Sequence, residues 1–529
     1  MSVPVAEKRV PAAALSLPAT GRLDVAAVAV PALLAAVLAS LQISSRSLGF
    51  DEAATVAIAS QHGSALWAAI AHDGGNMSGY YLLMHVLIGL LGNSPLVLRL
   101  PSAVAMVATV ACVGTIGLRL ANRRAALIAG LLTAVSLPVI YWAQTARGYA
   151  LMLAFVCAGF LAFLSLADEL ADRQRARRAG RLYAAAMILA CYCSFVAVLV
   201  IPVQLLALAR RPAALRRLVR ALVVVAGFGI PLVVLAVARG SGQLFWVPRP
   251  SSRVDTQVLE SITSAGLEPT FHRSPTTYLL IVVTLVTLGA LLVWVPIARR
   301  RGEPVWALSL ALGWFALPVS LTFVYSLISQ PLFLPRNLLT SVPAVAIALA
   351  LALSDRRIPR LVALAAVTGL IVLRALQVAD SYGVSPEPWR QVTRTVLAQA
   401  RPGDCIAFYP EDGRSAFAYY TGTRVPARAP RSILPAVSWG ISRPYVEDYV
   451  TLTPAALRRR STGCKRMWLI SSHEGELDGP LRSRVNRARF RRLDSDLQAA
   501  FGAAPVQKYG YASAIHVQLL PGQGRRVVP

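Results

Sequence analysis

Two adjacent carboxylates, Asp51 and Glu52, stand in the stretch SLGFDEAATVAI, just after an apolar run from Asp24 to Ser44. That run is long enough to cross the core of a bilayer. An ionisable group at a membrane boundary is a candidate functional group, and a carboxylate there can take a proton from a hydroxyl. Helix capping is the alternative, with Asp51 at the cap and Glu52 in the first turn, where the helix dipole favours an acid. The two roles are compatible.

Arginines supply the opposite charge further along the chain. Arg147 lies in YWAQTARGYAL with Gln144 and Tyr149, Arg336 lies in SQPLFLPRNLL, and Arg99 lies in LVLRLPSA. A guanidinium group matches the oxygens of a phosphate, so Arg99, Arg147 and Arg336 together are candidates to surround an anion. The alternative for each is an interfacial arginine whose head extends to the lipid headgroups.

Another polar stretch, HDGGNMSGYYLLMH, supplies candidate acceptor or pocket residues: His72, Asp73, Asn76, Tyr80 and His85. Asp51, Glu52 and Asp73 are oxygen ligands of the type that a hard divalent cation prefers, so such a cation is a candidate partner. No histidine pair or CxxC with zinc-site spacing occurs, and we predict no dedicated metal site. The sequence also has no Walker A stretch and no dinucleotide glycine fingerprint, so no nucleotide or redox cofactor is expected.

Composition defines the class of protein. Of the 529 residues 56% are hydrophobic and only 15% are charged, and the mean hydropathy is +0.57. Several apolar runs are about 18 residues or longer, which predicts a polytopic α-helical membrane protein. The net charge is +28, but the arginines gather in short turns between apolar runs. This is the positive-inside pattern, so nucleic acid is not an expected partner.

Eleven segments are predicted to cross the membrane: 24–44, 99–119, 125–143, 149–167, 180–193, 195–209, 220–238, 277–297, 305–326, 338–354 and 361–378. The turns that follow the second, fourth, sixth, eighth and tenth of these segments are rich in arginine. This pattern places those turns and the N-terminal tail (1–23) in the cytoplasm. The segment 79–92 is too short to cross and is predicted to lie at the outer interface. The stretch 182–209 holds either two short helices or one long one.

This threading leaves three segments outside the cytoplasm: the loops 45–98 and 239–276, and everything from residue 379 to 529. The last segment mixes a helical pattern with strand-like runs such as CIAFYP and RMWLIS, which predicts an extracytoplasmic α/β domain after a transmembrane domain over 24–378. Cys405 opens one predicted strand and Cys464 precedes another. The pair is a candidate disulfide in an oxidising compartment, and two buried free thiols are the alternative.

Five stretches of the chain, taken in order, resemble the family 39 glycosyltransferases of the GT-C fold, the protein mannosyltransferase and aminoarabinose transferase relatives. They are FDEA, HDGGNMSGYYLLMHVLIGLLGNSPLVLRLPSA, YWAQTARGYALMLAF, FLPRNLLTSVPAVAIALA and EPWRQVTRTVLAQARPGDCIAFYP. The resemblance covers residues 24 to about 425. The chain departs from the family at Thr145 and Gly148, where relatives often carry an acid and a proline, and at Asn337, where they often carry an aromatic residue.

The resemblance implies a multi-pass enzyme of the plasma (inner) membrane that moves a sugar from a polyprenyl-monophosphate donor to an acceptor hydroxyl. The acceptor would be a lipid glycan, a polysaccharide or a protein on the extracytoplasmic face, and the sugar mannose first and arabinose next. Asp51 would act as the general base or orient the acceptor, with Glu52 beside it. Gln144, Arg147 and Tyr149 would line the donor pocket, and Arg336 would face the phosphate. The alternatives are a transporter or flippase for lipid-linked sugars and a catalytically inactive scaffold for envelope assembly.

Overall fold

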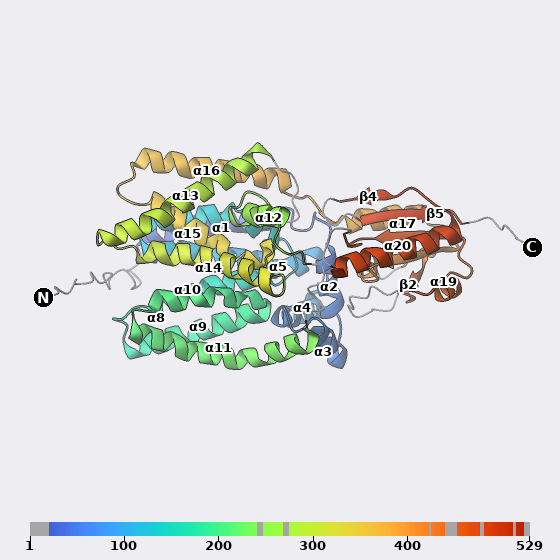
Figure 1. Cartoon of the computed structure of the whole chain (residues 1–529), viewed down its shortest axis with the longest axis horizontal. Helices are drawn as coiled ribbons and strands as arrows, with labels where there is room; N and C mark the ends of the chain where they lie inside the picture. The colour runs from blue at the N-terminus through green and yellow to red at the C-terminus, as the bar shows by residue number, and fades with distance from the viewer. Residues whose placement is uncertain are drawn as a thin grey trace, which may run out of the picture.

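The computed structural model describes residues 21–240, 247–267, 274–422, 425–439, 452–476, 481–510 and 515–522. Residues 1–20 of the predicted N-terminal tail lie outside this part of the chain. So do 241–246 and 268–273 of the predicted loop 239–276. Figure 1 shows a bundle of helices at one end of the molecule and a smaller domain of strands and helices at the other.

Seven helices of the described residues are long and apolar enough to cross a membrane: α1 (Arg22–Ser40), α5 (Pro95–Leu120), α8 (Tyr149–Leu166), α11 (Pro212–Arg239), α13 (Pro275–Arg300), α14 (Trp306–Ile328) and α16 (Arg360–Ser381). An eighth span results if α6 (Arg123–Ala134) and α7 (Leu137–Ala143), which meet at 62°, are counted together. The protein is therefore a helical membrane protein.

Other helices fill the remaining predicted segments: α9 (Arg173–Cys193), the 3-10 helix η2 (Phe195–Val200) with α10 (Ile201–Leu208), and α15 (Ser341–Leu353). The stretch 182–209 is two helices, because the backbone of Ser194 is extended between α9 and η2. Helix thus occupies each of the eleven segments. Among those outside the spans named above, α9 is long enough but too rich in arginine, and the others are too short.

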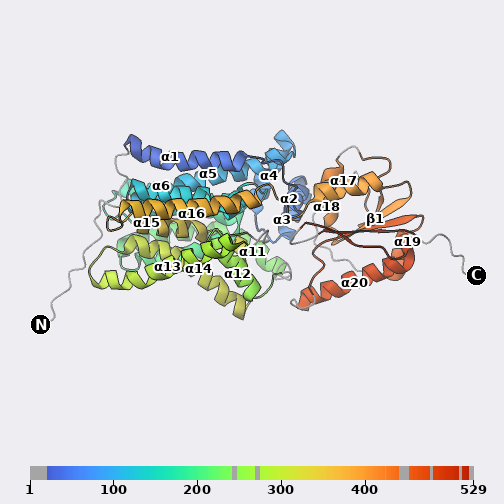
Figure 2. The same ribbon diagram turned by 90° about the horizontal axis from the view of Figure 1, so that it is seen from above.

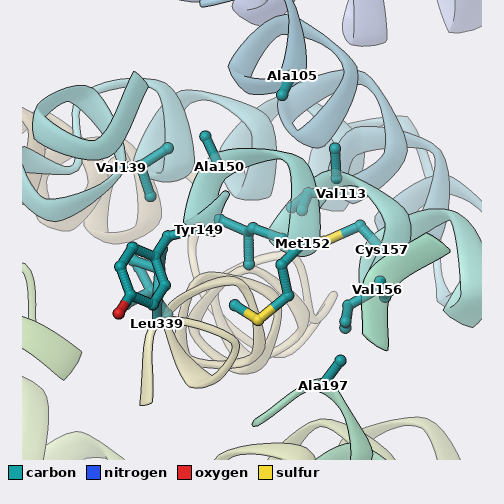
Figure 3. Close-up of a cluster of buried hydrophobic side chains, with 14 of the residues drawn as sticks. Ala105, Val113, Val139, Tyr149, Ala150, Met152, Val156, Cys157, Ala197 and Leu339 are labelled. Atoms are coloured by element: carbon teal, nitrogen blue, oxygen red, sulfur yellow. The ribbon is translucent and has the colours of Figure 1, made fainter. Parts of the chain in front are cut away.

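Close packing of small and apolar side chains builds the interior of the bundle. In α8, 78% of the apolar window is buried, whereas in α11 and α13 the fraction is 17%, so α8 is central and the other two turn apolar surface outward. Figure 3 shows part of the interior, where Met152 and Val156 of α8 lie among neighbouring helices. Gly117 faces the backbone of α6 so closely that a Cβ would lie 2.8 Å from the Ala125 oxygen. Small residues allow such contact where lipid supplies no hydrophobic drive for helix association.

Three short helices lie at the end of the bundle that faces the smaller domain: α2 (Phe50–Ala59), α3 (Gly63–His72) and α4 (Ser78–Leu91) (Figure 2). The predicted non-crossing segment 79–92 coincides with α4. Since α1 leads into α2 and successive helices alternate in direction, the arginine-rich turns after α5, α8, α10, α13 and α15 lie at the opposite end (Figure 1).

The C-terminal domain is a five-stranded mixed sheet in the order β2-β1-β3-β5-β4. Its strands are β1 (Asp404–Tyr409), β2 (Arg431–Leu434), β3 (Arg466–Ser471), β4 (Gln507–Tyr509) and β5 (Ile515–Leu520). The first three are parallel, and β5 and β4 are antiparallel to their neighbours. Its helices are α17 (Trp389–Gln399), α18 (Gly413–Thr421), α19 (Pro454–Arg460) and α20 (Leu481–Phe501). A disulfide joins Cys405 and Cys464, whose Cα atoms are 5.5 Å apart.

Helix α2 links the two parts of the molecule. Ala53 of α2 belongs to the same buried apolar cluster as Trp389 of α17 and Phe417 of α18. Just before α2, the Leu48 N–H donates a hydrogen bond of 2.6 Å to the hydroxyl of Tyr420, also on α18. The C-terminal domain therefore packs directly on the helix that carries the two adjacent carboxylates.

Candidate functional site

Glu52 is buried and fully engaged by the protein. The Arg99 guanidinium donates to both of its carboxylate oxygens, at 2.9 and 2.8 Å, and the Ala146 N–H donates to Oε1 at 2.8 Å. The Gly49 N–H adds a bond of 3.1 Å at the start of α2. Burial alone would raise the pKa of Glu52, but the charge and hydrogen bonds of Arg99 outweigh it and the pKa is lowered. Glu52 is therefore a permanent anion inside the protein.

Arg99 is placed differently from the sequence-based prediction. It lies in α5 with a side chain that is 0% exposed. Besides Glu52, it donates hydrogen bonds to three backbone oxygens, those of Ile43, Arg46 and Ser47. These contacts use all five guanidinium N–H groups. Arg99 thus joins α5 to the segment between α1 and α2 and has no N–H left to bind a phosphate.

Asp51, by contrast, faces outward at the first turn of α2, and its side chain is 42% exposed. Two arginines from distant parts of the chain approach its Oδ2 atom, Arg336 at 3.4 Å and Arg147 at 3.8 Å. Desolvation raises the pKa of Asp51, but the charges of Arg147 and Arg336 outweigh it and lower the pKa overall. The predicted carboxylate and two of the three predicted cations therefore meet.

The turn between α7 and α8 aims Arg147 at Asp51. Ala146 is held on both sides, because its N–H binds Glu52 and its oxygen accepts from the Thr55 hydroxyl at 3.0 Å. A Cβ at Gly148 would lie 2.5 Å from the Cys193 oxygen, so only glycine fits there. Glycine at this position thus follows from close backbone contact. Glu52 positions Arg147 by holding the residue before it.

Arg147 also belongs to a chain of polar contacts that ends at Asp73. Its Nη1 lies 3.2 Å from the Tyr81 hydroxyl, and that hydroxyl donates a hydrogen bond of 2.8 Å to Asp73 Oδ2. Burial raises the pKa of Asp73 to about 6, even though Arg147 and the Tyr81 hydrogen bond oppose the shift. Asp73 was predicted as a pocket residue, and Tyr81 was missed because nothing local distinguishes it from Tyr80.

A fixed turn presents Arg336. It lies in the 3-10 helix η4 (Pro335–Leu338) after α14. The Ser326 hydroxyl accepts hydrogen bonds of 2.8 Å from the N–H groups of Leu332 and Phe333, and the Asn337 side chain donates to the Leu332 oxygen at 2.9 Å. Asn337 therefore stabilises the loop that carries Arg336.

Two further groups at this site come from the C-terminal half of the chain, and the sequence reasoning missed both. Glu387 accepts a hydrogen bond of 2.5 Å from the Phe50 N–H, next to Asp51. His473, two residues after β3, places its Nε2 3.9 Å from Glu387 Oε1 and its ring 5.0 Å from the Phe50 ring. The sequence offered one signal for each: Glu387 comes just before the predicted helix PWRQ, and His473 comes just after the predicted strand RMWLIS.

Other predicted pocket residues have contacts that stabilise the fold. Gln144 is buried and donates to the oxygens of Leu38 and Leu41 and to the Tyr382 hydroxyl, which ties α7 to α1 and α16. Tyr149 is 4% exposed and packs on Trp142 with ring centres 4.5 Å apart. Neither contact places the side chain next to Asp51.

The remaining candidates lie in and around α4. Asn76 accepts a hydrogen bond of 3.3 Å from the Phe195 N–H, which fastens the loop before α4 to the break between α9 and η2. His85 lies 2.8 Å from the Ala59 oxygen, at the end of α2. Tyr80 is fully buried, and His72 ends α3 and is half-buried. These residues shape the surroundings of the site.

Among the described residues, no group of three or more His, Cys, Asp or Glu side chains is arranged to hold a metal ion. A surface groove of about 670 Å³ lies nearby, where Ser47 meets Pro388, Arg390 and Arg394 of the C-terminal domain. Asp51 does not line this groove. The groove therefore lies beside the Asp51 site and is not part of it.

The architecture is that of the GT-C fold of membrane enzymes, with a small C-terminal sheet. The structure is similar to that of ArnT from Cupriavidus metallidurans bound to undecaprenyl phosphate, with a TM-score of 0.52 at 14% sequence identity, over 94% of this chain and 97% of that chain. The apo state of the same protein gives a TM-score of 0.51 with the same coverage. No protein-family model matches the sequence, and no curated protein matches it either.

Proposed function

We propose that this protein is a membrane glycosyltransferase that moves a sugar from a polyprenyl-monophosphate donor to an acceptor hydroxyl. The observation that carries the proposal is the exposed Asp51 carboxylate between Arg147 and Arg336. Two fixed guanidinium groups suit a lipid phosphate, and a carboxylate beside them suits a hydroxyl. The fold shared with a protein solved with undecaprenyl phosphate bound supports the same donor class.

The chemistry follows from these groups. The acceptor oxygen attacks the anomeric carbon, and the bond from that carbon to the phosphate oxygen breaks with its electron pair passing to the phosphate. Arg147 and Arg336 stabilise the negative charge that grows there. Asp51 contacts the attacking hydroxyl, either taking its proton or orienting it. A single displacement inverts the anomeric centre, by the geometry that governs inverting glycosidases.

We infer the cellular setting from the charge pattern. The arginine-rich turns lie at the end of the bundle opposite Asp51, so under the positive-inside rule the site faces away from the cytoplasm of a plasma (inner) membrane. The transporter or flippase alternative is less well supported, because the carboxylate and the two arginines that approach it, Asp51, Arg147 and Arg336, all lie together at one end of the bundle. The sugar we propose first is mannose and next arabinose, and the acceptor is a lipid glycan, a polysaccharide or a protein.

The test is transfer itself. The purified protein, reconstituted with membranes that supply acceptor, is given radiolabelled polyprenyl-phosphate mannose or arabinose, and the label that moves from the donor to another product is measured. Transfer of one donor's label to a glycolipid, polysaccharide or protein product is the expected result. Absence of transfer from both donors, with no binding of undecaprenyl phosphate, would reject the proposed function.

A further inference from the structure

The loop after β3 is built to hold one side chain toward the helical domain. It begins with Ser472, whose N–H donates to the Tyr409 oxygen at 2.8 Å, and continues to His473. His473 has φ of +51°, a left-handed conformation that non-glycine residues seldom adopt. Backbone strain of this type persists where the surroundings enforce it, often at functional sites.

Contacts on both sides of His473 hold its backbone in this left-handed conformation. The Asn486 side chain of α20 donates to the His473 oxygen at 2.9 Å. Glu474, the next residue, accepts from the Ser471 hydroxyl at 2.7 Å, lies 2.6 Å from His516 Nδ1 of β5, and pairs with Arg487. The loop is thus anchored to two strands and to α20 while the His473 imidazole points away from them.

The imidazole points at the Asp51 site. Its ring contacts Phe50, the residue before Asp51, and its charge is among those that lower the pKa of the Asp51 carboxyl. Its Nδ1 lies 3.2 Å from the Ser472 hydroxyl. When Nδ1–H donates to that hydroxyl, Nε2 keeps its lone pair on the side of Glu387. The side chain is 34% exposed, so a substrate can reach it.

We propose that His473 is a catalytic residue supplied by the C-terminal domain, whose Nε2 contacts the acceptor hydroxyl and takes its proton. The proposal rests on the proposed function. As the acceptor oxygen bonds to the anomeric carbon, its proton passes to Nε2, and the Glu387 carboxylate, 3.9 Å away, stabilises the imidazolium. The proton then leaves to solvent, and the lipid phosphate departs as the anion.

Asp51 and His473 have different roles for a chemical reason. Asp51 is approached by two guanidinium groups, which make a carboxylate a weak proton acceptor. Imidazole is the side chain best suited to take and release a proton near neutral pH. In this arrangement Asp51 orients the hydroxyl and His473 removes its proton. The active site would be complete only when the C-terminal domain is docked on α2.

The experiment compares His473→Ala with His62→Ala, a control histidine on the exposed start of α3. We expect His473→Ala to bind undecaprenyl phosphate as the wild type does, to lose transfer by about 100-fold or more, and to regain part of it when imidazole is added. His62→Ala should transfer at the wild-type rate. A His473→Ala rate equal to wild type, or a loss that imidazole does not restore and that leaves the pH profile unchanged, would overturn the proposal.

A second variant guards against a mere folding defect. Glu387→Gln keeps an acceptor for the Phe50 N–H but removes the charge beside His473. The charged groups that act on His473 are Glu387 and Asp51, whereas the carboxylate of the next residue, Glu474, is taken up by Ser471, His516 and Arg487. Because Glu387 favours the imidazolium, its loss should lower kcat with little change in donor KM and move the acid limb of the kcat profile to lower pH. An unmoved limb would count against His473. Failure of wild-type protein to bind undecaprenyl phosphate or transfer sugar would instead reject the function itself.

Discussion

Arg99 holds Glu52 with two hydrogen bonds of 2.9 and 2.8 Å inside the protein, while the adjacent carboxylate faces the surface. The two neighbouring carboxylates, Asp51 and Glu52, therefore have different roles. Glu52 fixes the start of α2 and the turn that carries Arg147. Asp51 is left exposed between the cations that this framework aims at it.

Glu52→Gln should destabilise the fold, because it leaves the Arg99 guanidinium buried without its counter-charge. Breaking one partner of a buried ion pair costs about 3–5 kcal/mol. Thermal unfolding in detergent should show a much lower midpoint for Glu52→Gln than for Asp51→Asn. The double variant Glu52→Gln with Arg99→Met should recover part of the loss, since no unpaired charge remains. Equal midpoints for Glu52→Gln and the wild type would contradict the structural role.

Asp51→Asn should abolish sugar transfer and leave the fold intact, because the carboxylate that pairs with Arg147 and Arg336 is 42% exposed and its loss strands no fully buried charge. Binding of undecaprenyl phosphate should be retained, since Arg147 and Arg336 remain and lose a competing anion. Transfer and lipid binding are measured on the same preparation. An Asp51→Asn protein with wild-type turnover would remove Asp51 from the reaction.

Arg147→Ala and Arg336→Ala should each weaken the binding of polyprenyl phosphate by about 10- to 100-fold, the size of a lost charge-assisted hydrogen bond. Arg253→Ala is the matched control, because this arginine is exposed and pairs with Glu476 on the surface. Titration of the lipid phosphate into each variant gives the comparison. An affinity that falls equally in the control would point to general surface charge.

Asp73→Asn should make stability less dependent on pH. Burial raises the pKa of Asp73 to about 6 in the folded protein, above the unfolded value near 4. The stabilisation that comes from its protonated form is complete below the unfolded pKa and is lost as pH rises through 6. The asparagine variant, which still accepts from Tyr81, should therefore be more stable than wild type at pH 8, by up to about 3 kcal/mol, and not at pH 4. Unfolding midpoints at both pH values decide this.

Much of the architecture could be predicted from local pattern. Apolar runs of bilayer length marked most of the helical segments, and FDEA, QTARGY and LPRN stood out as polar stretches beside them. The strand-like runs CIAFYP and RMWLIS predicted an α/β domain and form β1 and β3, whereas the strand order and directions of the sheet came only from the structure. The sequence did not decide whether 182–209 forms two short helices or one long helix, because both have the same hydropathy. The break at Ser194 was found only in the structure.

By itself, then, the sequence determined the class of protein, its helices and a short set of candidate residues, since length and periodicity are local properties. Tertiary structure decided which of the candidate residues are buried and which are exposed. Successive residues of a helix point about 100° apart, so packing alone sent Glu52 inward to Arg99 and Asp51 outward to Arg147 and Arg336. It also brought Glu387 and His473 to Phe50 across more than 300 residues, a contact that no local pattern records.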